Sequence, residues 1–299
     1  MSALTLILFL SQFPFAQINC ETKSVDENFM PKNQSQEDLE WCFAFSASNI
    51  LSFYENTPLS AYDIALRNHL HPAISKNRKK TKLGETFGSP SKAMMIAALH
   101  SPQGICKEVS SSSEKVDWAS RSRFVQRISD TQRSLSEISC DHKNEAKKLP
   151  HAVLNILDKL NGGNRAAAFL DVTCQKHKMI RTYEKNNFHH YSKSDFGIEK
   201  LKLKMHEMLN KEEPSNISYS IGHLLTDEKF QKGEFIHAST LVAKRWNQTR
   251  KTCEFKLRDS YNKKDCSKRN TKIRCEGSDF WIDESVLIQG ISAVETIEL

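Results

Sequence analysis

The chain has 299 residues, carries a formal net charge of +7 and is 38% hydrophobic. This length allows one large or two modest domains with a real hydrophobic core. Its basic residues gather in short loop-like runs without interleaved aromatics, so no nucleic-acid partner is expected, and no segment reaches the roughly 18 apolar residues of a membrane span, so no stable membrane insertion is expected.

The N-terminal segment is apolar over residues 4–10 and has a small residue at Ala16. This pattern predicts a secretory signal peptide at residues 1–16 and an exported protein, in a secreted, periplasmic or endomembrane (lysosome-like) compartment. Eight cysteines in such a chain indicate disulfides. No CxxC pair occurs, so no zinc site is expected. No other metal and no cofactor is expected. Two of Cys253, Cys266 and Cys275 are expected to pair, and the spacing leaves open which two.

The first strong helical pattern runs to about residue 55, where Asn-Thr-Pro interrupts it. Apolar or small residues recur on one expected buried face, at Cys42, Phe45, Ser46, Asn49, Ile50 and Phe53. Cys42 is therefore expected in the first turn, where unpaired N–H groups and the helix dipole favour a thiolate. Taken alone, the pattern favours a cysteine that acts as a small core hydrophobe, which is one of the commonest roles of a free cysteine.

Further helices are expected along the next part of the chain. Ser60 and Asp63 mark the start of one helix. A short helix at 92–99 follows a turn at residues 88–91, and a longer amphipathic helix covers 198–209. The stretch between is expected to be mostly helical, at 118–135 and 152–160, with 166–174 open as either strand or helix start.

The last third of the chain changes to strand-like patterns. Alternating or β-branched runs predict strands at 217–221, 237–243, 253–257, 280–282 and 294–297. Helices that precede antiparallel strands indicate an α+β fold. We expect an N-terminal helical lobe at 17–110, a mostly helical insertion at 111–196, and a β-rich lobe at 197–299.

The chain offers, one after another, the four kinds of group that nucleophilic catalysis by cysteine needs. A cysteine nucleophile needs a base, a group that holds the base, and donors for the oxyanion. Gln36 and the backbone N–H of Cys42 could donate to the oxyanion, His237 begins an apolar strand, and Asp259 ends the next strand. Each residue alone is a weak signal, and their joint order carries the hypothesis.

Several segments resemble the papain-like cysteine proteases. The resemblance rests on QEDLEWCFAFSASNILS for the active-site helix, GSPSKAMMIAALHSPQGIC for the second motif, HASTLVAKRWN for the histidine strand, and FKLRDSYN for the segment after it. It implies a two-lobed α+β fold, with Cys42 on a helical lobe and His237 on an antiparallel β lobe. The catalytic residues that it implies are Gln36, Cys42, His237 and Asp259, and the substrate-binding residues are Trp41, Gly88, Ile236 and Tyr261.

The resemblance also implies a function, a monomeric peptidase that hydrolyses peptide or protein substrates through a thioester on Cys42. This sequence departs from the family at Leu39, where a cysteine is usual, and the spacing from Cys42 to His237 exceeds the usual 130–150 residues by roughly 50. Asp259 replaces the usual asparagine, and Tyr261 and Asn262 replace Trp and Gly. An aspartate can still fix the histidine tautomer, as in serine triads.

Two other functions fit the same residues. A catalytically impaired papain-fold protein could serve as a binding or scaffold module, which the segment DSYN favours. A transferase or deamidase could use the same thioester with an amine in place of water.

Overall fold

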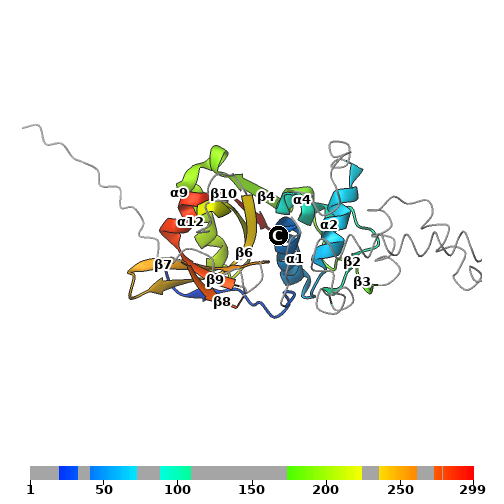
Figure 1. Ribbon diagram of the computed structural model, residues 1–299. Coiled ribbons are helices and arrows are strands. Elements are labelled where there is room, and N and C mark those ends of the chain that lie inside the picture. Colours follow the sequence, from blue (N-terminus) through cyan, green and yellow to red (C-terminus); the bar gives the residue numbers. More distant parts are fainter. Residues whose placement is uncertain are drawn as a thin grey trace, which may run out of the picture.

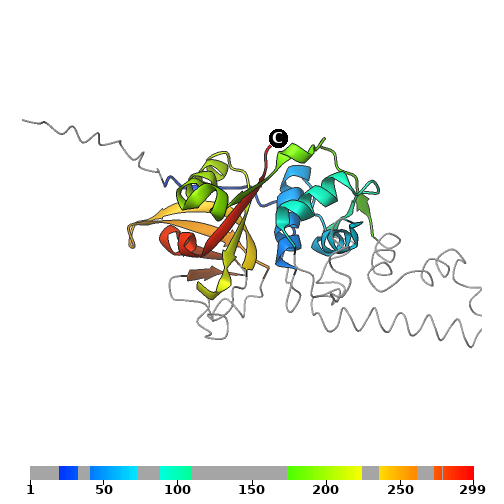
Figure 2. The same ribbon diagram turned by 90° about the horizontal axis from the view of Figure 1, so that it is seen from above.

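The computed structural model describes residues 20–32, 41–72, 88–108, 174–223, 236–260, 273–277 and 279–299. These residues form two hydrophobic cores, one among helices and one beneath an antiparallel sheet. Figures 1 and 2 show helix α1 between the sheet on one side and helices α2 and α4 on the other. The predicted α+β class is confirmed, with Cys42 in the helical lobe and His237 in the β lobe.

The helical lobe consists of α1 (Cys42–Glu55), α2 (Ala61–Leu70) and α4 (Pro90–Leu99). As predicted, α2 begins after Ser60, whose Oγ accepts a hydrogen bond of 3.4 Å from the backbone N–H of Asp63. The short strands β2 (Ile105–Cys106) and β3 (Lys176–His177) pair antiparallel beside these helices. A disulfide between Cys106 and Cys174 joins the same two segments.

Helix α1 differs from the amphipathic helix that the sequence pattern suggests. Every residue from Phe43 to Glu55 except Phe53 is buried. The reason is its position: α2 and α4 pack on one side of α1 and β6 packs on the other. A helix that is covered all round needs no polar face, which is why small residues such as Ala44, Ala47 and Ser48 occupy positions that would otherwise be exposed.

The β lobe is an antiparallel sheet in the order β4-β10-β5-β6-β7-β9-β8, and β1 pairs with β6. Its strands are β1 (Lys23–Ser24), β4 (Phe188–Ser192), β5 (Ser215–Ser220), β6 (Ile236–Asn247), β7 (Thr252–Arg258), β8 (Ile273–Glu276), β9 (Asp279–Asp283) and β10 (Ile291–Ile297). Helices α9 (Lys193–Asn210) and α12 (Glu284–Gly290) cover its core, and two 3-10 turns lie at Lys185–Asn187 and Ile221–His223.

A strand is present at each of the five predicted places, 217–221, 237–243, 253–257, 280–282 and 294–297, and each is longer than its pattern indicated. The first, β5, ends one residue early, because Ile221 begins a 3-10 turn. Strand β4 and helix α12 were not predicted, and α9 begins at Lys193, before the expected lobe boundary at 196/197. The expected signal peptide and the helices at 118–135 and 152–160 lie outside the described residues. In the part of the chain that the structure describes, no helix is long and apolar enough to cross a bilayer.

The disulfides narrow one expectation. Cys253 is bonded to Cys20, so the expected pair among Cys253, Cys266 and Cys275 cannot include Cys253. Cys275 is also disulfide-bonded, and Cys266 lies outside the described residues. The bond from Cys20 joins the segment at residues 20–25 to the β lobe. In this segment, β1 pairs antiparallel with β6.

A row of polar side chains crosses the sheet where it faces the helical lobe. His190, Glu295, Asn216 and Thr240 are successive register partners on β4, β10, β5 and β6. We call these four residues the polar row. Two serines at the start of α4 and two polar residues of α1 bond to the polar row, so the two lobes meet through hydrogen bonds. The bonding residues are Ser89, Ser91, Ser46 and Asn49.

Candidate active site

Cys42 is the first residue of α1, directly after the N-cap residue Trp41. Among the cysteines that the structure describes it is the free one, and it is partly exposed. The first turn of a helix leaves backbone N–H groups without helical partners and carries the positive end of the helix dipole. The predicted placement of Cys42 in the first turn is therefore observed.

His237 and Asp259 come together from neighbouring strands. His237 is the second residue of β6, and Asp259 directly follows β7. Nε2 of His237 lies 2.7 Å from Oδ1 of Asp259, and the two residues are only 3% and 5% exposed. Because β6 and β7 pair antiparallel, the start of one strand lies near the end of the other.

The Cys42 thiol, in the helical lobe, forms a hydrogen bond with His237 in the β lobe. Burial lowers the pKa of His237, but the charges of Asp259 and Cys42, and hydrogen bonds to both side chains, outweigh it and raise the pKa to about 9. The histidine is thus placed between a thiol and a carboxyl group. Such an arrangement can hold a proton on the imidazole while the sulfur carries a negative charge.

Two hydroxyl residues that the sequence analysis missed lie behind this pair. The ring of Tyr219 packs edge-to-face on His237, with centroids 5.6 Å apart. Its Oη lies 2.9 Å from Oγ of Ser239, and that serine donates to Oδ1 of Asp259 at 3.4 Å. The signal in the sequence was a pair of hydroxyl residues, Ser239 and Thr240, inside the largely apolar run after His237.

The residues expected to bind substrate have different positions. Ile236 is 53% exposed beside His237, so its side chain is open to a ligand. Gly88 packs on α1, where an added Cβ would lie 2.6 Å from the ring of Phe43, so only glycine permits this approach. Trp41 is buried in the helical core against Tyr62, and its ring does not reach the surface. Gln36 and Tyr261 lie outside the described residues.

Hydrogen bonds below the site tie the cysteine helix to the histidine strand. Oγ1 of Thr240 lies 3.1 Å from Oγ of Ser46 and accepts from Nδ2 of Asn49, also at 3.1 Å. Both α1 residues lie one to two turns below Cys42, and Thr240 lies three residues after His237. These bonds therefore join the helix that carries the thiol to the strand that carries the imidazole.

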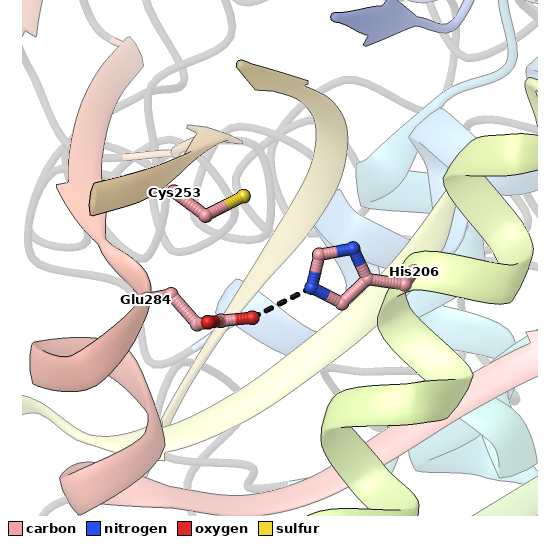
Figure 3. Close-up of side chains that lie close together, drawn as sticks. All are labelled: His206, Cys253 and Glu284. Carbon is pink, nitrogen blue, oxygen red and sulfur yellow. Dashed lines mark hydrogen bonds and ion pairs between the residues drawn. The ribbon is translucent and has the colours of Figure 1, made fainter. Parts of the chain in front are cut away.

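A second cluster of potential ligands lies within the β lobe, as Figure 3 shows. His206 and Glu284 are joined by a contact of 2.6 Å between Nε2 and Oε1, and the Cys253 sulfur lies nearby. That sulfur is bonded to Cys20, and the other ring nitrogen of His206 lies 3.3 Å from the buried ammonium group of Lys244. With its sulfur in a disulfide and a lysine beside its histidine, the cluster does not offer a three-ligand metal site.

Comparison with known proteins finds distant structural likeness. No protein-family model matches the chain, and no curated protein matches its sequence. Solved structures with a similar course include SERA5E of Plasmodium falciparum, at 10% identity and TM-score 0.49 over 94% of this chain and 97% of that one. Others are the proform of the ragweed pollen cysteine protease Amb a 11 (11%, 0.48, 96% and 68%) and digestive procathepsin L 3 of Tenebrio molitor larval midgut (10%, 0.46, 97% and 72%). At such identities and TM-scores, the fold assignment rests on the elements of this chain.

Proposed function

We propose that the chain is a papain-like cysteine peptidase, with Cys42 as nucleophile, His237 as acid and base, and Asp259 as the group that orients His237. The observation that carries the proposal is the position of His237, which interacts with a free thiol on one side and lies 2.7 Å from a carboxyl oxygen on the other. A structural cysteine in a core needs neither partner.

The first half of the reaction forms a thioester. The Cys42 thiolate attacks the carbonyl carbon of a peptide bond, and the carbonyl electron pair moves to oxygen. The backbone N–H of Cys42 and, by resemblance, the side chain of Gln36 donate to this oxyanion. As the C–N bond breaks, the imidazolium of His237 gives its proton to the leaving nitrogen.

The second half releases the acyl product. His237, now neutral, takes a proton from a water molecule, and the resulting hydroxide attacks the thioester carbon. The C–S bond then breaks, so that a carboxylic acid leaves while the Cys42 thiolate and the His237 imidazolium are restored. Ile236, exposed beside His237, is positioned to contact the side chains of the substrate.

The pH dependence of the rate follows from the charges around His237. Although burial lowers its pKa, Asp259 and Cys42 raise that pKa to about 9. The protonated form needed for departure of the amine therefore persists through neutral pH. We expect the alkaline limb of kcat/KM to lie at this pKa, so that the rate falls as the pH rises through it.

The test uses hydrolysis of a peptide library together with labelling by a thiol-directed epoxide. Cys42→Ala should abolish both, and His237→Ala should abolish hydrolysis, because each removes a group that exchanges bonds or protons. His189→Ala, which alters a histidine of β4 outside the site, is the matched control and should retain activity. Hydrolysis that survives in the Cys42→Ala protein would overturn the proposal.

The alternative functions predict other outcomes of the same test. A binding or scaffold protein would react with the epoxide no faster than free cysteine, since its thiol is not activated. A transferase or deamidase would be labelled rapidly and would form amide products when an amine is supplied.

The disulfides from Cys20 and Cys106 support the exported compartment that we propose for the protein. We also propose that it acts as a monomer.

A further inference from the structure

We propose that Tyr219 and Ser239 form a hydroxyl relay that positions Asp259 against His237 and holds the Asp259 carboxylate charged. The inference rests on the proposed function, because it concerns the group that orients the histidine in that reaction. Tyr219 and Ser239 are positioning residues, since neither touches the substrate or the reacting atoms.

The strand register brings the relay together. Tyr219 on β5 is the register partner of His237 on β6, so the two rings lie side by side. Ser239 lies two residues after His237 on the same strand, where successive alternate side chains share a face of the sheet. All four residues of the set, Tyr219, His237, Ser239 and Asp259, are buried.

The contacts form a closed circuit. The Tyr219 ring packs edge-to-face on His237 at 83°, and the phenol oxygen lies 2.9 Å from Oγ of Ser239. Ser239 donates to Oδ1 of Asp259 at 3.4 Å, and the same oxygen lies 2.7 Å from Nε2 of His237. Tyr219 therefore acts on the histidine twice, directly through its ring and indirectly through two hydrogen bonds.

The chemistry of the groups fixes the direction of the relay. An ionised carboxylate can only accept hydrogen bonds, so the hydrogen of Ser239 points at Asp259. The Ser239 oxygen is then left to accept, and the phenol of Tyr219 is the donor 2.9 Å away. A donor that is itself bonded in this way is polarised and donates more strongly.

The relay answers a difficulty that a buried aspartate creates. Burial disfavours the charged form of a carboxyl group, whereas hydrogen bonds to the charged form favour it. Oδ1 of Asp259 receives one such bond from Ser239 and another, of 2.7 Å, from the backbone N–H of Ser260. The carboxylate thereby stays charged and stabilises the imidazolium beside it. An asparagine at this position would carry no charge and would need no such support.

The experiment measures the protonation of His237 by NMR and the alkaline limb of kcat/KM in the same variants. Ser239→Ala removes the donor to Asp259, and we expect it to lower the His237 pKa by about half to one pH unit, with the alkaline limb moving by the same amount. Tyr219→Phe keeps the ring and removes only the hydroxyl, so the shift should be smaller and in the same direction. Ser239→Thr keeps a hydroxyl at this position, so the His237 pKa should stay at the value of the parent protein.

Non-additivity separates a relay from two independent supports. Because the Tyr219 hydroxyl acts through Ser239, Tyr219→Phe should cause no further shift once Ser239 is alanine. In Asp259→Asn protein, Ser239→Ala should shift the His237 pKa less than in the parent. Ser218→Ala is the matched control, since this serine neighbours Tyr219 on β5 and its hydroxyl accepts from Asn216 of the polar row; it should leave the His237 pKa unchanged.

The outcomes also separate the relay from the proposed function. NMR titration in the Cys42→Ala protein needs no catalysis, so a Ser239-dependent shift there supports the relay even if the parent cleaves no peptide. An unchanged His237 pKa in folded Ser239→Ala protein, or fully additive shifts in the double variant, would overturn the relay. If the Ser239→Ala protein still hydrolyses peptides, the proposed function stands even though the relay does not.

Discussion

Two buried glutamates occupy different regions of the molecule, and each bonds to the part that surrounds it. Glu55, the last residue of α1, lies inside the helical lobe. Its oxygens lie 2.9 Å from Nε2 of His177 and accept from the Tyr183 hydroxyl at 2.7 Å and from the backbone N–H of Ile180 at 2.7 Å. Glu55 thus fixes one segment, 177–183, to one helix of the same lobe.

Glu295, the second buried glutamate, lies on β10 between the lobes. It accepts from Ser89, the N-cap residue of α4, at 2.8 Å and from Ser91 of α4 at 3.2 Å. It also accepts from Nδ2 of Asn216 on β5 at 2.7 Å. His190 on β4 lies 2.8 Å from the same side chain. Glu295 therefore joins elements of different lobes, and its neighbourhood responds to anything that moves one lobe against the other.

The comparison shows that the two glutamates have different roles. Glu55 supports the fold of one lobe, whereas Glu295 supports the position of one lobe against the other. A buried carboxylate inside a lobe secures local structure, so its loss should weaken folding. The polar row lies between the lobe that carries Cys42 and the lobe that carries His237, so its loss should disturb the geometry between thiol and imidazole. Substitutions in the two places should therefore be separable by experiment.

The largest loss of stability is expected for Glu55→Ala. The change leaves the donors of segment 177–183 without their acceptor inside the helical lobe. We expect the free energy of unfolding to fall by about 3–5 kcal/mol, measured by denaturant titration. Glu199→Ala, at an exposed position of α9, is the control and should change it by less than about 0.5 kcal/mol. Equal effects of the two variants would contradict the role of Glu55.

Glu295→Ala should cost less stability and more activity. The loss removes hydrogen bonds between the lobes and is expected to lower the free energy of unfolding by about 2–3 kcal/mol. At a temperature where both variants are folded, kcat should fall further in Glu295→Ala than in Glu55→Ala. If the two variants lose activity in proportion to their loss of stability, the distinction between lobe interior and lobe interface fails.

His190 predicts a pH dependence of the contact between the lobes. Its hydrogen bond to Glu295 raises the pKa of His190, aided by Asp195 and opposed by burial and Lys92. Because the folded-state pKa is above the unfolded value near 6.5, the stabilisation is complete below that value and is lost as the pH rises through the raised pKa. Unfolding titrations of the parent and of His190→Gln should diverge below about pH 6.5 and converge above the raised pKa. Parallel curves across this range would contradict the assignment.

The smallest expected effect is that of Thr240→Val, which keeps the shape of the side chain. The hydroxyl that bonds Ser46 and Asn49 is removed, at a cost of about 1 kcal/mol. Because this hydroxyl helps to set α1 against β6, kcat should fall more than KM changes. Thr252→Val on β7, away from the lobe interface, is the control. An equal effect on kcat in both variants would show that Thr240 does not align the site.

The sequence predicted the features that depend on neighbouring residues. The placement of Cys42 in the first turn of α1 follows from helical periodicity and a breaker after Glu55, and the start of α2 follows from its Ser60 cap. The pairing of His237 with Asp259 followed from their order at strand ends. For Cys42 and Ser60 the signal lies within a few residues of the position that it describes, whereas His237 and Asp259 are brought together by the pairing of consecutive strands.

Features that depend on strand register were not predictable in this way. Tyr219 meets His237, and Glu295 meets Asn216, only because β5 pairs in one register with β6 and with β10. Strand β4 was missed because it is half-exposed and its residues, FHHYS, lack apolar alternation. Helix α12 is too short, at 7 residues, to show a helical period.

The course of the chain through the two lobes has a consequence for how the protein unfolds. Residues near Cys20 are fastened to the β lobe by the bond to Cys253. At the other end, Ile297 lies in the core of the helical lobe, where its carbonyl accepts a 2.8 Å hydrogen bond from Tyr54. The chain therefore passes from the β lobe to the helical lobe, back to the β lobe, and finally to the helical lobe again. Neither lobe can unfold without disturbing a segment that is fixed in the other lobe. A single cooperative calorimetric transition is expected from a molecule with two separate cores.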